Sequence, residues 1–421
     1  MEKENRARAH VARLDLSTAQ VAVLDGQAHT ARALWNLLHE YFTFRQGRFA
    51  TVKECDEAIR AARKQIDWMG QLPAQAAQAV LKAYRQAWAN YLNPDHRARR
   101  PAFKTRRFRM AVDVPQARDL QIKRLNRRWG AINLPKVGRV RFRWTKDLPG
   151  VVKGGASGRV TGARLVKDAF GWQIIFRTEI PHAVPASHRG ERVGIDRGVT
   201  VALALSDATT REHGPWLSGG ERERLRRLEK KAARQRASHR RGEPRSQRIS
   251  RTYGQIARLR ATAKRRAIDW QHQTTTELAG TFGVIVVEDL RVINMVRSVK
   301  GAAQAPGRNV AQKAGLNRAI SEQAWGRTVT LLAYKATDRG GQVVKVPAAG
   351  TSQTCHRCGH RDPAARVSQA VFSCTSPACG WIGNADHNAA INIENAAGTA
   401  VSGRGDFGVT RSVKRQPPYA A

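Results

Sequence analysis

The chain has 421 residues, of which 41% are hydrophobic, so it can form two or three globular domains with apolar cores. Lys and Arg together number 74 against 33 Asp and Glu, which gives a formal net charge of +41. Because so many cations repel one another in a compact fold, the excess predicts a polyanionic partner, and nucleic acid is the obvious candidate. A basic protein of the membrane surface is the alternative, but the sequence shows no amphipathic anchor, lipidation signal, signal peptide or membrane-spanning run.

Helical periodicity dominates the first quarter of the chain. Ser17 and Gln20 form a capping box, and apolar residues then recur at helical spacing. Further helices are expected over 52–67 and 74–92. Residues 17–93 therefore predict an α-helical lobe, whose aromatic residues we interpret as core and not as a platform for stacked bases.

Two basic stretches that follow are interpreted as contacts to nucleic acid. Residues 96–109 form a linker rich in Lys and Arg. Over 138–144, arginines alternate with apolar residues, which is the period of a strand with one buried face. The alternative is a solvated strand face without a ligand, but in so basic a chain we favour phosphate contact. The predicted contact residues are Lys104, Arg106, Arg107, Arg139, Arg141 and Arg143.

The remaining patterns divide the chain into a β part and an α/β part. Residues 107–180 predict a small β-barrel or sandwich, and strands alternate with helices from residue 191. Residues 192–205 are expected to form two strands joined by a tight turn at Arg197 and Gly198.

Three further segments complete the α/β part. Residues 221–267 carry 18 Lys and Arg against four Glu, and they predict a basic helical hairpin that follows nucleic acid. Residues 283–290 predict a buried strand. A helix over 321–341 and a short strand over 342–348 follow.

Cysteines are few, and four of the five lie together. Their spacing within 350–381 is C-x2-C-x15-C-x4-C, which fits two turns that bring four thiolates around a structural Zn²⁺. The second pair is wider than the usual spacing, so His356, His360 and His387 are alternatives for the fourth ligand. Cys55 stands apart and is interpreted as a packed thiol. The predicted ligands are Cys355, Cys358, Cys374 and Cys379.

Three acids stand at the ends of predicted elements. Asp196 ends the first strand of the α/β part, Glu288 ends a later buried strand, and Asp386 opens a helix. Each has an ordinary alternative, as a turn residue, a surface residue or a helix N-cap respectively. In an RNase H-like fold, however, acids from these three elements meet at one end of the sheet and hold two Mg²⁺ ions about 3.5–4 Å apart. We therefore predict that Asp196, Glu288 and Asp386 are catalytic metal ligands, with Asp289 on the opposite face.

Five motifs in the second half of the chain together point to one family. They are GIDRG (194–198), VVEDL (286–290), TSQTCHRCGH (351–360), FSCTSPACGW (372–381) and ADHNAAINI (385–393). In this combination the chain resembles the TnpB family of transposon-encoded nucleases, which are relatives of the type V CRISPR effectors. The first half resembles the family more loosely, through LPAQAAQAVLKAY, RPAFKTRR and LPKVGRVRFR. The wide second cysteine pair departs from many relatives.

The resemblance implies an α+β multidomain protein with a helical recognition lobe, a small β-barrel wedge domain and an RNase H-like (RuvC) nuclease domain that carries a zinc-ribbon insertion. The expected segments are the first part of the wedge domain (1–16), the recognition lobe (17–106), the wedge domain (107–190), the RuvC-like domain (191–350), the zinc ribbon that contacts target nucleic acid (351–384), the last RuvC-like segment (385–400) and a disordered tail (401–421).

The function implied by the resemblance is RNA-guided DNA cleavage in a bacterial or archaeal cytoplasm. A guide RNA from the transposon end would pair with double-stranded target DNA next to a short flanking motif. The protein would act as a monomer in this ribonucleoprotein. The alternatives are a miniature type V CRISPR effector, a non-cleaving guided DNA-binding regulator and a DNA transposase, although a zinc ribbon between the second and third acids argues against the last.

Overall fold

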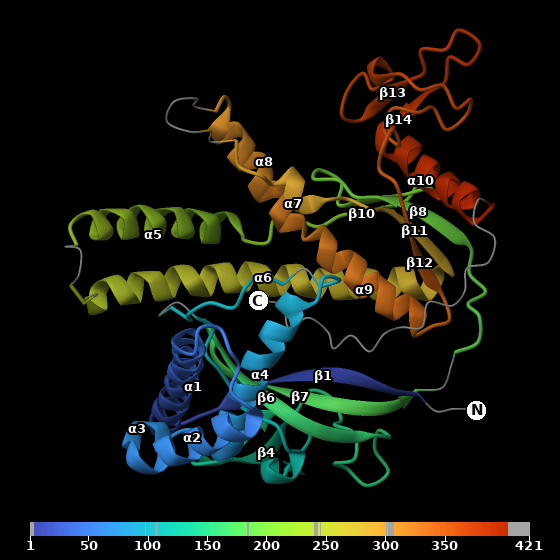
Figure 1. Cartoon of the computed structure of the whole chain (residues 1–421). Helices are drawn as coiled ribbons and strands as arrows, with labels where there is room; N and C mark the ends of the chain where they lie inside the picture. The colour runs from blue at the N-terminus through green and yellow to red at the C-terminus, as the bar shows by residue number, and fades with distance from the viewer. Residues whose placement is uncertain are drawn as a thin grey trace. The chain divides into compact units, whose positions relative to one another are not determined.

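The computed structural model of the chain describes residues 4–96, 98–105, 108–182, 185–239, 243–244, 246–299, 301 and 307–402. The chain forms two compact units, Met1–Val184 with Leu228–Ala261, and Pro185–Arg227 with Thr262–Ala421. Each unit contains a sheet and helices of its own (Figure 1). None of the helices in the described part of the chain has the length and apolar character needed to cross a membrane.

The helices of the first unit lie at the places that the periodicity predicts. Ser17 accepts a hydrogen bond from the backbone of Gln20, whose side chain accepts one from the backbone of Ser17, so the capping box is confirmed. Trp35 and Trp88 are buried, which confirms that these rings belong to the core, whereas Tyr91 is 40% exposed. The helices are α1 (Thr18–Phe44), α2 (Val52–Gln65), α3 (Asp67–Gly70) and α4 (Ala74–Leu92).

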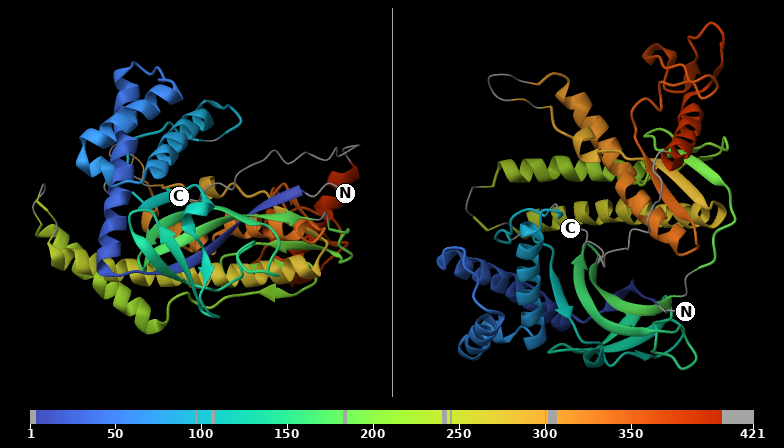
Figure 2. Two further views of the ribbon diagram at one scale, coloured as in Figure 1. Left: turned by 90° about the horizontal axis from the view of Figure 1, so that it is seen from below. Right: turned by 45° about the vertical axis from the view of Figure 1, so that its right-hand side comes forward.

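The first unit also contains a seven-stranded antiparallel sheet, which curves into a half-barrel (Figure 2). Its order is β2-β6-β7-β1-β5-β4-β3, so the N-terminal strand lies at the centre, between β7 and β5. The predicted alternation in β5 is confirmed, because Val140 and Phe142 are buried between exposed arginines. The strands are β1 (Glu4–Asp15), β2 (Ala111–Val114), β3 (Lys123–Arg124), β4 (Trp129–Leu134), β5 (Gly138–Arg143), β6 (Arg159–Asp168) and β7 (Gly171–His182).

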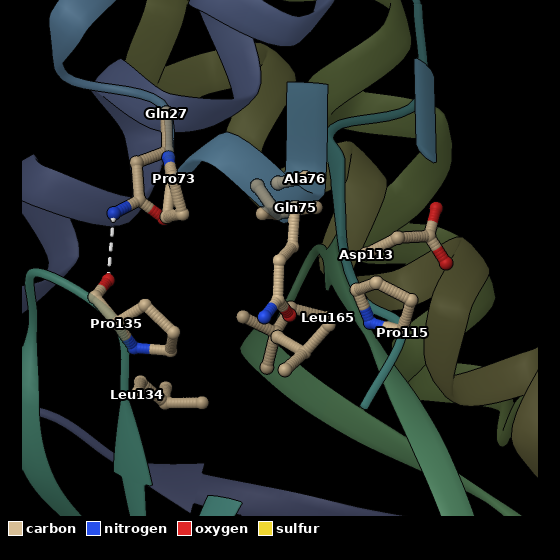
Figure 3. Close-up of a pocket in the computed structure, with 11 residues that line it drawn as sticks. Gln27, Pro73, Gln75, Ala76, Asp113, Pro115, Leu134, Pro135 and Leu165 are labelled. Atoms are coloured by element: carbon tan, nitrogen blue, oxygen red, sulfur yellow. Dashed lines mark hydrogen bonds between the residues drawn. The ribbon is translucent and has the colours of Figure 1, made fainter. Parts of the chain in front are cut away.

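A small cavity lies where α1 and α4 meet this sheet (Figure 3). At its edge the buried Gln27 side chain donates a hydrogen bond of 3.1 Å to the carbonyl of Pro135. The cavity volume is about 10 Å³, which is close to the minimum for one water molecule. No nucleotide or cofactor fits there, so the cavity reflects packing between the helices and the sheet.

The second unit is built on a five-stranded sheet of order β10-β9-β8-β11-β12. Strands β8, β11 and β12 are parallel, whereas β9 and β10 are antiparallel to their neighbours. The expected tight turn at Arg197 and Gly198 is wrong, because residues 197–202 connect β8 to β9. This longer connection lets the buried Arg197 guanidinium donate to the backbone carbonyl of Glu288. The strands are β8 (Arg192–Asp196), β9 (Leu203–Leu205), β10 (Thr210–Arg211), β11 (Val284–Glu288) and β12 (Gln342–Val346).

The predicted basic hairpin is confirmed as α5 (Gly219–Ala237) and α6 (Gln247–Thr281). The single helix expected over 321–341 is wrong, because Ala324 has a left-handed backbone, with φ of 49°, and separates α8 (Val310–Gln323) from α9 (Trp325–Thr337). Hydrogen bonds to Gln323 hold this break: its carbonyl accepts from Gln271 and its side chain donates to the carbonyl of Val199, each at 3.1 Å.

The chain after β12 forms a small cysteine-containing segment and a final helix. This part contains β13 (Val371–Ser373), β14 (Ile382–Asn384) and α10 (Ala385–Ser402). A short helix, α7 (Val292–Met295), lies earlier in the chain, between β11 and α8. Because α10 extends to Ser402, the first two residues of the expected disordered tail are helical. The remainder of that tail lies outside the described residues.

Candidate active site and metal centre

Strand alternation decides where the first two acids point. In β8, Val193 and Ile195 belong to an apolar core that includes residues of α6 and α9. In β11, Ile285 and Val287 belong to the same core, whereas Val286 packs with residues of α10 on the other face. Because successive side chains alternate between the faces of a strand, Asp196 and Glu288 point toward the face that α10 covers.

The register places the two acids at the same level. Strands β8 and β11 are parallel neighbours, and Val287 lies opposite Ile195. The next residue along each strand is therefore Glu288 on β11 and Asp196 on β8. Both carboxylates stand at the carboxyl end of the sheet, where polar sites of open α/β sheets commonly form.

The third acid reaches the same edge because α10 lies unusually close to β8. A Cβ atom placed on Gly194 would be 2.1 Å from the carbonyl oxygen of Ala390 and 2.7 Å from the backbone nitrogen of Glu394. Only a glycine permits this approach of helix and strand backbones. It brings the first turn of α10, which contains Asp386, to the end of β8.

The electrostatics show that the three carboxylates meet. Burial, followed by repulsion from the neighbouring Glu288 and Asp386 carboxylates, raises the pKa of Asp196 to about 7. The guanidinium of Arg366 opposes this shift. Three acids that repel one another in a poorly solvated place make a site that favours a cation.

Asp386 is held by an arginine from the cysteine-containing segment. Arg366 donates to Asp386 Oδ1 at 3.0 Å. The alternative role of Asp386 as a helix cap is wrong, because Asn384 accepts from the backbone nitrogens of both Asp386 and His387 at 2.9 Å. The Asp386 side chain is therefore not needed to satisfy the helix terminus.

Glu288 is held by an uncharged donor. Its side chain is buried, and Thr351 Oγ1 donates to Oε1 at 2.7 Å. The neighbouring Asp289, which follows the end of β11, is exposed, with its carboxylate 3.5 Å from Lys345 Nζ. These two adjacent acids thus have different surroundings, and only Glu288 faces Asp196.

The four predicted cysteine ligands form a compact cluster. All four sulfur atoms lie within 4.8 Å of one another. The sulfurs of Cys355 and Cys379 are 3.9 Å apart, and those of Cys358 and Cys374 are 3.6 Å apart. Tetrahedral zinc with bonds of roughly 2.3 Å places its ligands roughly 3.8 Å apart, so this cluster can hold a metal such as zinc.

The wide second pair is accommodated by its backbone. Gly359 and Gly380 each follow the second cysteine of a pair and have left-handed φ values of 74° and 57°. The backbone nitrogen of Cys379 donates to the carbonyl of Ser376 and closes the longer turn. None of the described histidines joins the cluster, and His356 instead contacts Asn388.

The three carboxylates are spaced more widely than the sulfurs. Among the described residues, the four cysteines are the only His, Cys, Asp or Glu set of three or more whose ligand atoms all lie within 4.8 Å of one another. The donor chemistry of Asp196, Glu288 and Asp386 nevertheless fits Mg²⁺, which prefers carboxylate oxygens and retains several waters.

Of the residues expected to contact phosphates, Lys104 has an intramolecular partner. Its ammonium lies 3.7 Å from the centroid of the Trp35 ring, and its backbone nitrogen donates to Asn36. Burial lowers the pKa of Lys104 to about 8. The side chain thus helps to fix residues 98–105 against α1. Arg106 and Arg107 lie outside the described residues.

The three arginines of β5 share one exposed face, as predicted. Arg141 and Arg143 each lie 5.3 Å from the ring of Trp129 on β4, and Arg141 also forms an ion pair of 2.6 Å with Asp15. Arg139 is exposed, and its carbonyl accepts a hydrogen bond from Gln20. This face combines cations with an aromatic ring, a combination suited to nucleic acid.

Sequence reasoning missed Thr351 and Arg366, which hold two of the acids. Thr351 opens the TSQTCHRCGH motif, so its place beside the cysteines was a usable signal. Arg366 lies between the two cysteine pairs in a stretch without periodicity, and only the fold brings it to Asp386.

Two family models match separate parts of the chain. Residues 175–299 match a model described as a probable transposase, and residues 325–393 match one described as the Cas12f1-like TNB domain. The first match includes Asp196 and Glu288. The second includes Asp386 and the four cysteines.

The chain is also similar to named proteins along most of its length. It is 35% identical over 354 residues to the putative RNA-guided DNA endonuclease InsQ of Escherichia coli (strain K12), covering 84% of this chain and 82% of that protein. A putative RNA-guided DNA endonuclease of Streptomyces pristinaespiralis is 26% identical over 82% of this chain and 76% of its own. The CRISPR-associated endodeoxyribonuclease Cas12f1 of Sulfoacidibacillus thermotolerans is 48% identical over 60 residues, 14% of each chain.

A solved structure shares the overall fold. The cryo-EM structure of a Cas12f1–sgRNA–target DNA complex matches with a TM-score of 0.52 and 15% sequence identity, covering 90% of this chain and 84% of that one. This agrees with the expected mixed α/β multidomain architecture.

Proposed function

The chain belongs to the TnpB family, and on this premise we propose that it is an RNA-guided DNA endonuclease whose active site consists of Asp196, Glu288 and Asp386. The observation that carries the site assignment is the geometry: Asp196 and Glu288 end neighbouring parallel strands, and the close approach of α10 to Gly194 brings Asp386 to the same edge. Burial of Asp196 and repulsion by Glu288 and Asp386 raise the pKa of Asp196 to about 7. Such a cluster of acids in a chain of net charge +41 is suited to a divalent cation beside a phosphodiester.

The sheet topology supports an RNase H-like, RuvC-type nuclease domain. The order β10-β9-β8-β11-β12, with antiparallel β8–β10 and parallel β8, β11 and β12, leaves the carboxyl ends of β8 and β11 side by side. The acids stand at those ends, and α10 supplies the third. The cysteine-containing segment between β12 and α10 then forms the zinc-ribbon insertion.

The three carboxylates would hold the catalytic ions, and neighbouring residues contact the carboxylates or the strand that carries them. Two Mg²⁺ ions held by these carboxylates would lower the pKa of the attacking water and stabilise the leaving 3′ oxygen. Thr351 donates a hydrogen bond to Glu288, and Arg366 neutralises part of the Asp386 charge. Arg197 fixes the end of β11 through the carbonyl of Glu288.

The cysteine cluster is proposed to hold a structural zinc ion. All four ligand positions come from the protein, so no coordination site is left open for a substrate. The metal would hold together a segment that contains only short strands and turns. That segment also carries Arg366, so its folded structure is needed to place the Arg366 guanidinium beside Asp386.

The proposed partners are a guide RNA made from the transposon end and double-stranded target DNA, bound by one protein molecule. The exposed arginines of β5 and the basic helices α5 and α6 offer cations to the phosphate backbones. Base pairing with the guide would select the target, and the protein would read the short flanking motif. A guide from a CRISPR array is the alternative, and sequencing the RNA that co-purifies with the chain decides between them.

Single substitutions of the acids test the proposal. Asp196→Asn, Glu288→Gln and Asp386→Asn should each reduce guide-directed DNA cleavage by about 10³-fold or more, because each removes a charged metal ligand. Guide RNA binding, measured by filter retention, should persist. Asp289→Asn is the matched control, since this neighbour of Glu288 is exposed and pairs with Lys345.

The same assay separates a nuclease from a guided DNA-binding regulator. A regulator would bind target DNA with its guide but leave it intact in Mg²⁺. Cleavage at the wild-type rate by any of the three acid variants would contradict the active-site assignment.

A further inference from the structure

A chain of hydrogen bonds joins the Glu288 carboxylate to the loop before the first cysteine pair. Thr351 is 8% exposed, and its hydroxyl donates to Glu288 Oε1 at 2.7 Å. The carbonyl of Thr351 in turn accepts from Asn392 Nδ2 of α10 at 2.9 Å. A proposed metal ligand on β11 is thus connected to the helix that carries Asp386.

The same helix clamps the rest of that loop. The side-chain nitrogens of Asn388 and Asn392 both donate to the carbonyl of Thr354, at 2.8 and 2.6 Å. Asn388 is fully buried, and its Oδ1 accepts from the backbone nitrogen of His356 at 2.9 Å. Thr354 and His356 flank Cys355. Two asparagines one helical turn apart therefore fix the loop from Thr351 to the first cysteine.

The Thr351 hydroxyl has one hydrogen and two acceptors within reach. Glu288 Oε1 lies at 2.7 Å, whereas the carbonyl oxygen of Ala348 lies at 3.3 Å. The shorter hydrogen bond to an ionised acceptor is the stronger one. The hydroxyl therefore donates to the carboxylate, and the rotation of that carboxylate is restricted.

The two donors to the acids differ in charge. Arg366 brings a positive charge to Asp386, whereas Thr351 is neutral and leaves the full charge of Glu288 available to a cation. A donor that fixes one carboxylate oxygen also sets the direction of the other. Outer contacts of this kind tune how tightly a ligand set binds its metal.

We propose that Thr351 is a positioning residue, which orients the Glu288 carboxylate for divalent metal binding while Asn388 and Asn392 hold its loop against α10. The proposal rests on the proposed function, since it takes Glu288 to be a metal ligand. The loop that begins the cysteine-containing segment then has two roles, one in that segment and one at the carboxylates.

Replacing Thr351 tests the proposal on the full chain with its guide RNA. Thr351→Val keeps the shape but removes the hydroxyl, and it should weaken Mn²⁺ binding, measured by electron paramagnetic resonance, by about 10-fold or more. The Mg²⁺ concentration for half-maximal cleavage should rise by a similar factor. Thr351→Ser should restore both values, and Thr351→Ala should resemble the valine variant.

Thr354→Val is the matched control. Its hydroxyl donates only within the loop, to the carbonyl of Gly350 at 2.9 Å, so Mn²⁺ binding should stay within about twofold of wild type. Zinc content and thermal melting are measured for every variant. If the valine variant does not fold, Mn²⁺ binding is compared between the serine and alanine variants, which differ by the hydroxyl alone.

Two results would overturn the proposal. One is equal Mn²⁺ binding by Thr351→Ser and Thr351→Ala. The other is loss of zinc from every variant without the hydroxyl, because the hydroxyl would then maintain the cysteine segment and not the carboxylate. Absence of guide-directed cleavage by the wild-type complex would instead contradict the proposed function, so the two failures are distinguishable.

Discussion

The four cysteines and the three carboxylates lie in the same unit but are assembled differently. The cysteines come from two short turns close in sequence, and their sulfurs gather within 4.8 Å of one another. The acids come from two strands and a helix far apart in sequence, and they are more widely spaced. One cluster is complete in itself, whereas two carboxylates of the other accept hydrogen bonds from the cysteine-containing segment, Glu288 from Thr351 and Asp386 from Arg366.

The difference shows how each cluster relates to its metal. Four thiolates satisfy a tetrahedral ion entirely, which is the pattern of a structural site. Asp196 instead has neighbours that disfavour its charged form, because burial and the Glu288 and Asp386 carboxylates raise its pKa to about 7. A site that leaves charge and coordination positions free suits ions that must also contact a substrate.

The largest expected effect is the loss of cleavage when a chelator removes the metal from the carboxylates but not from the cysteines. Brief treatment of the wild-type complex with EDTA should reduce cleavage by about 10³-fold or more, and added Mg²⁺ should restore it. Zinc at the cysteines should remain bound through this brief treatment, because the protein supplies all four ligands and structural zinc sites bind with an apparent free energy of about 10–16 kcal/mol. Cleavage and zinc content are followed in the same samples. Loss of zinc together with activity, without recovery in Mg²⁺, would show that the two sites are not independent.

A smaller effect concerns the close approach that places the third acid. Gly194→Ala should lower the free energy of unfolding by about 3 kcal/mol, because its Cβ would overlap the backbone of α10 at Ala390 and Glu394. Chemical denaturation measures this change. Gly254→Ala is the control, because Gly254 lies in α6 with open space around it, and alanine there should stabilise the helix by up to about 1 kcal/mol. Equal effects of the two variants would mean that α10 does not depend on Gly194.

Local signals in the sequence predicted much of the fold. The capping box at Ser17, the alternation in β5 and the ends of α4 depend on neighbouring residues, and the structure confirms them. The break at Ala324 was not predicted, because contacts from Gln271 and Val199 to Gln323 hold it, and these partners are distant in sequence.

In the candidate site, too, some features could be predicted from the sequence and others depend on contacts between distant segments. The grouping of the cysteines follows from their spacing, and the three acids were proposed from their places at the ends of elements together with a family resemblance. The contacts of Thr351 and Arg366 join segments that no local period relates. Asn384 caps α10 because the helix begins at Ala385, one residue earlier than the sequence pattern indicated.

The smallest expected effect tests, without metal, the burial of Asp196 and its repulsion by the two neighbouring carboxylates. Between the ordinary pKa of 3.8 and the folded value of about 7, the folded state holds the Asp196 proton more tightly than the unfolded chain does. The stability of metal-free protein should therefore fall by on the order of 2 kcal/mol as the pH rises through this window. Asp196→Asn should remove this component, so its urea midpoint in EDTA should exceed that of wild type at pH 7.5 but not at pH 4. Mg²⁺ should narrow the difference at pH 7.5, because a cation at the site stabilises the charged wild-type cluster. Equal midpoints at pH 7.5 in EDTA would mean that Asp196 carries no excess charge for a metal to neutralise.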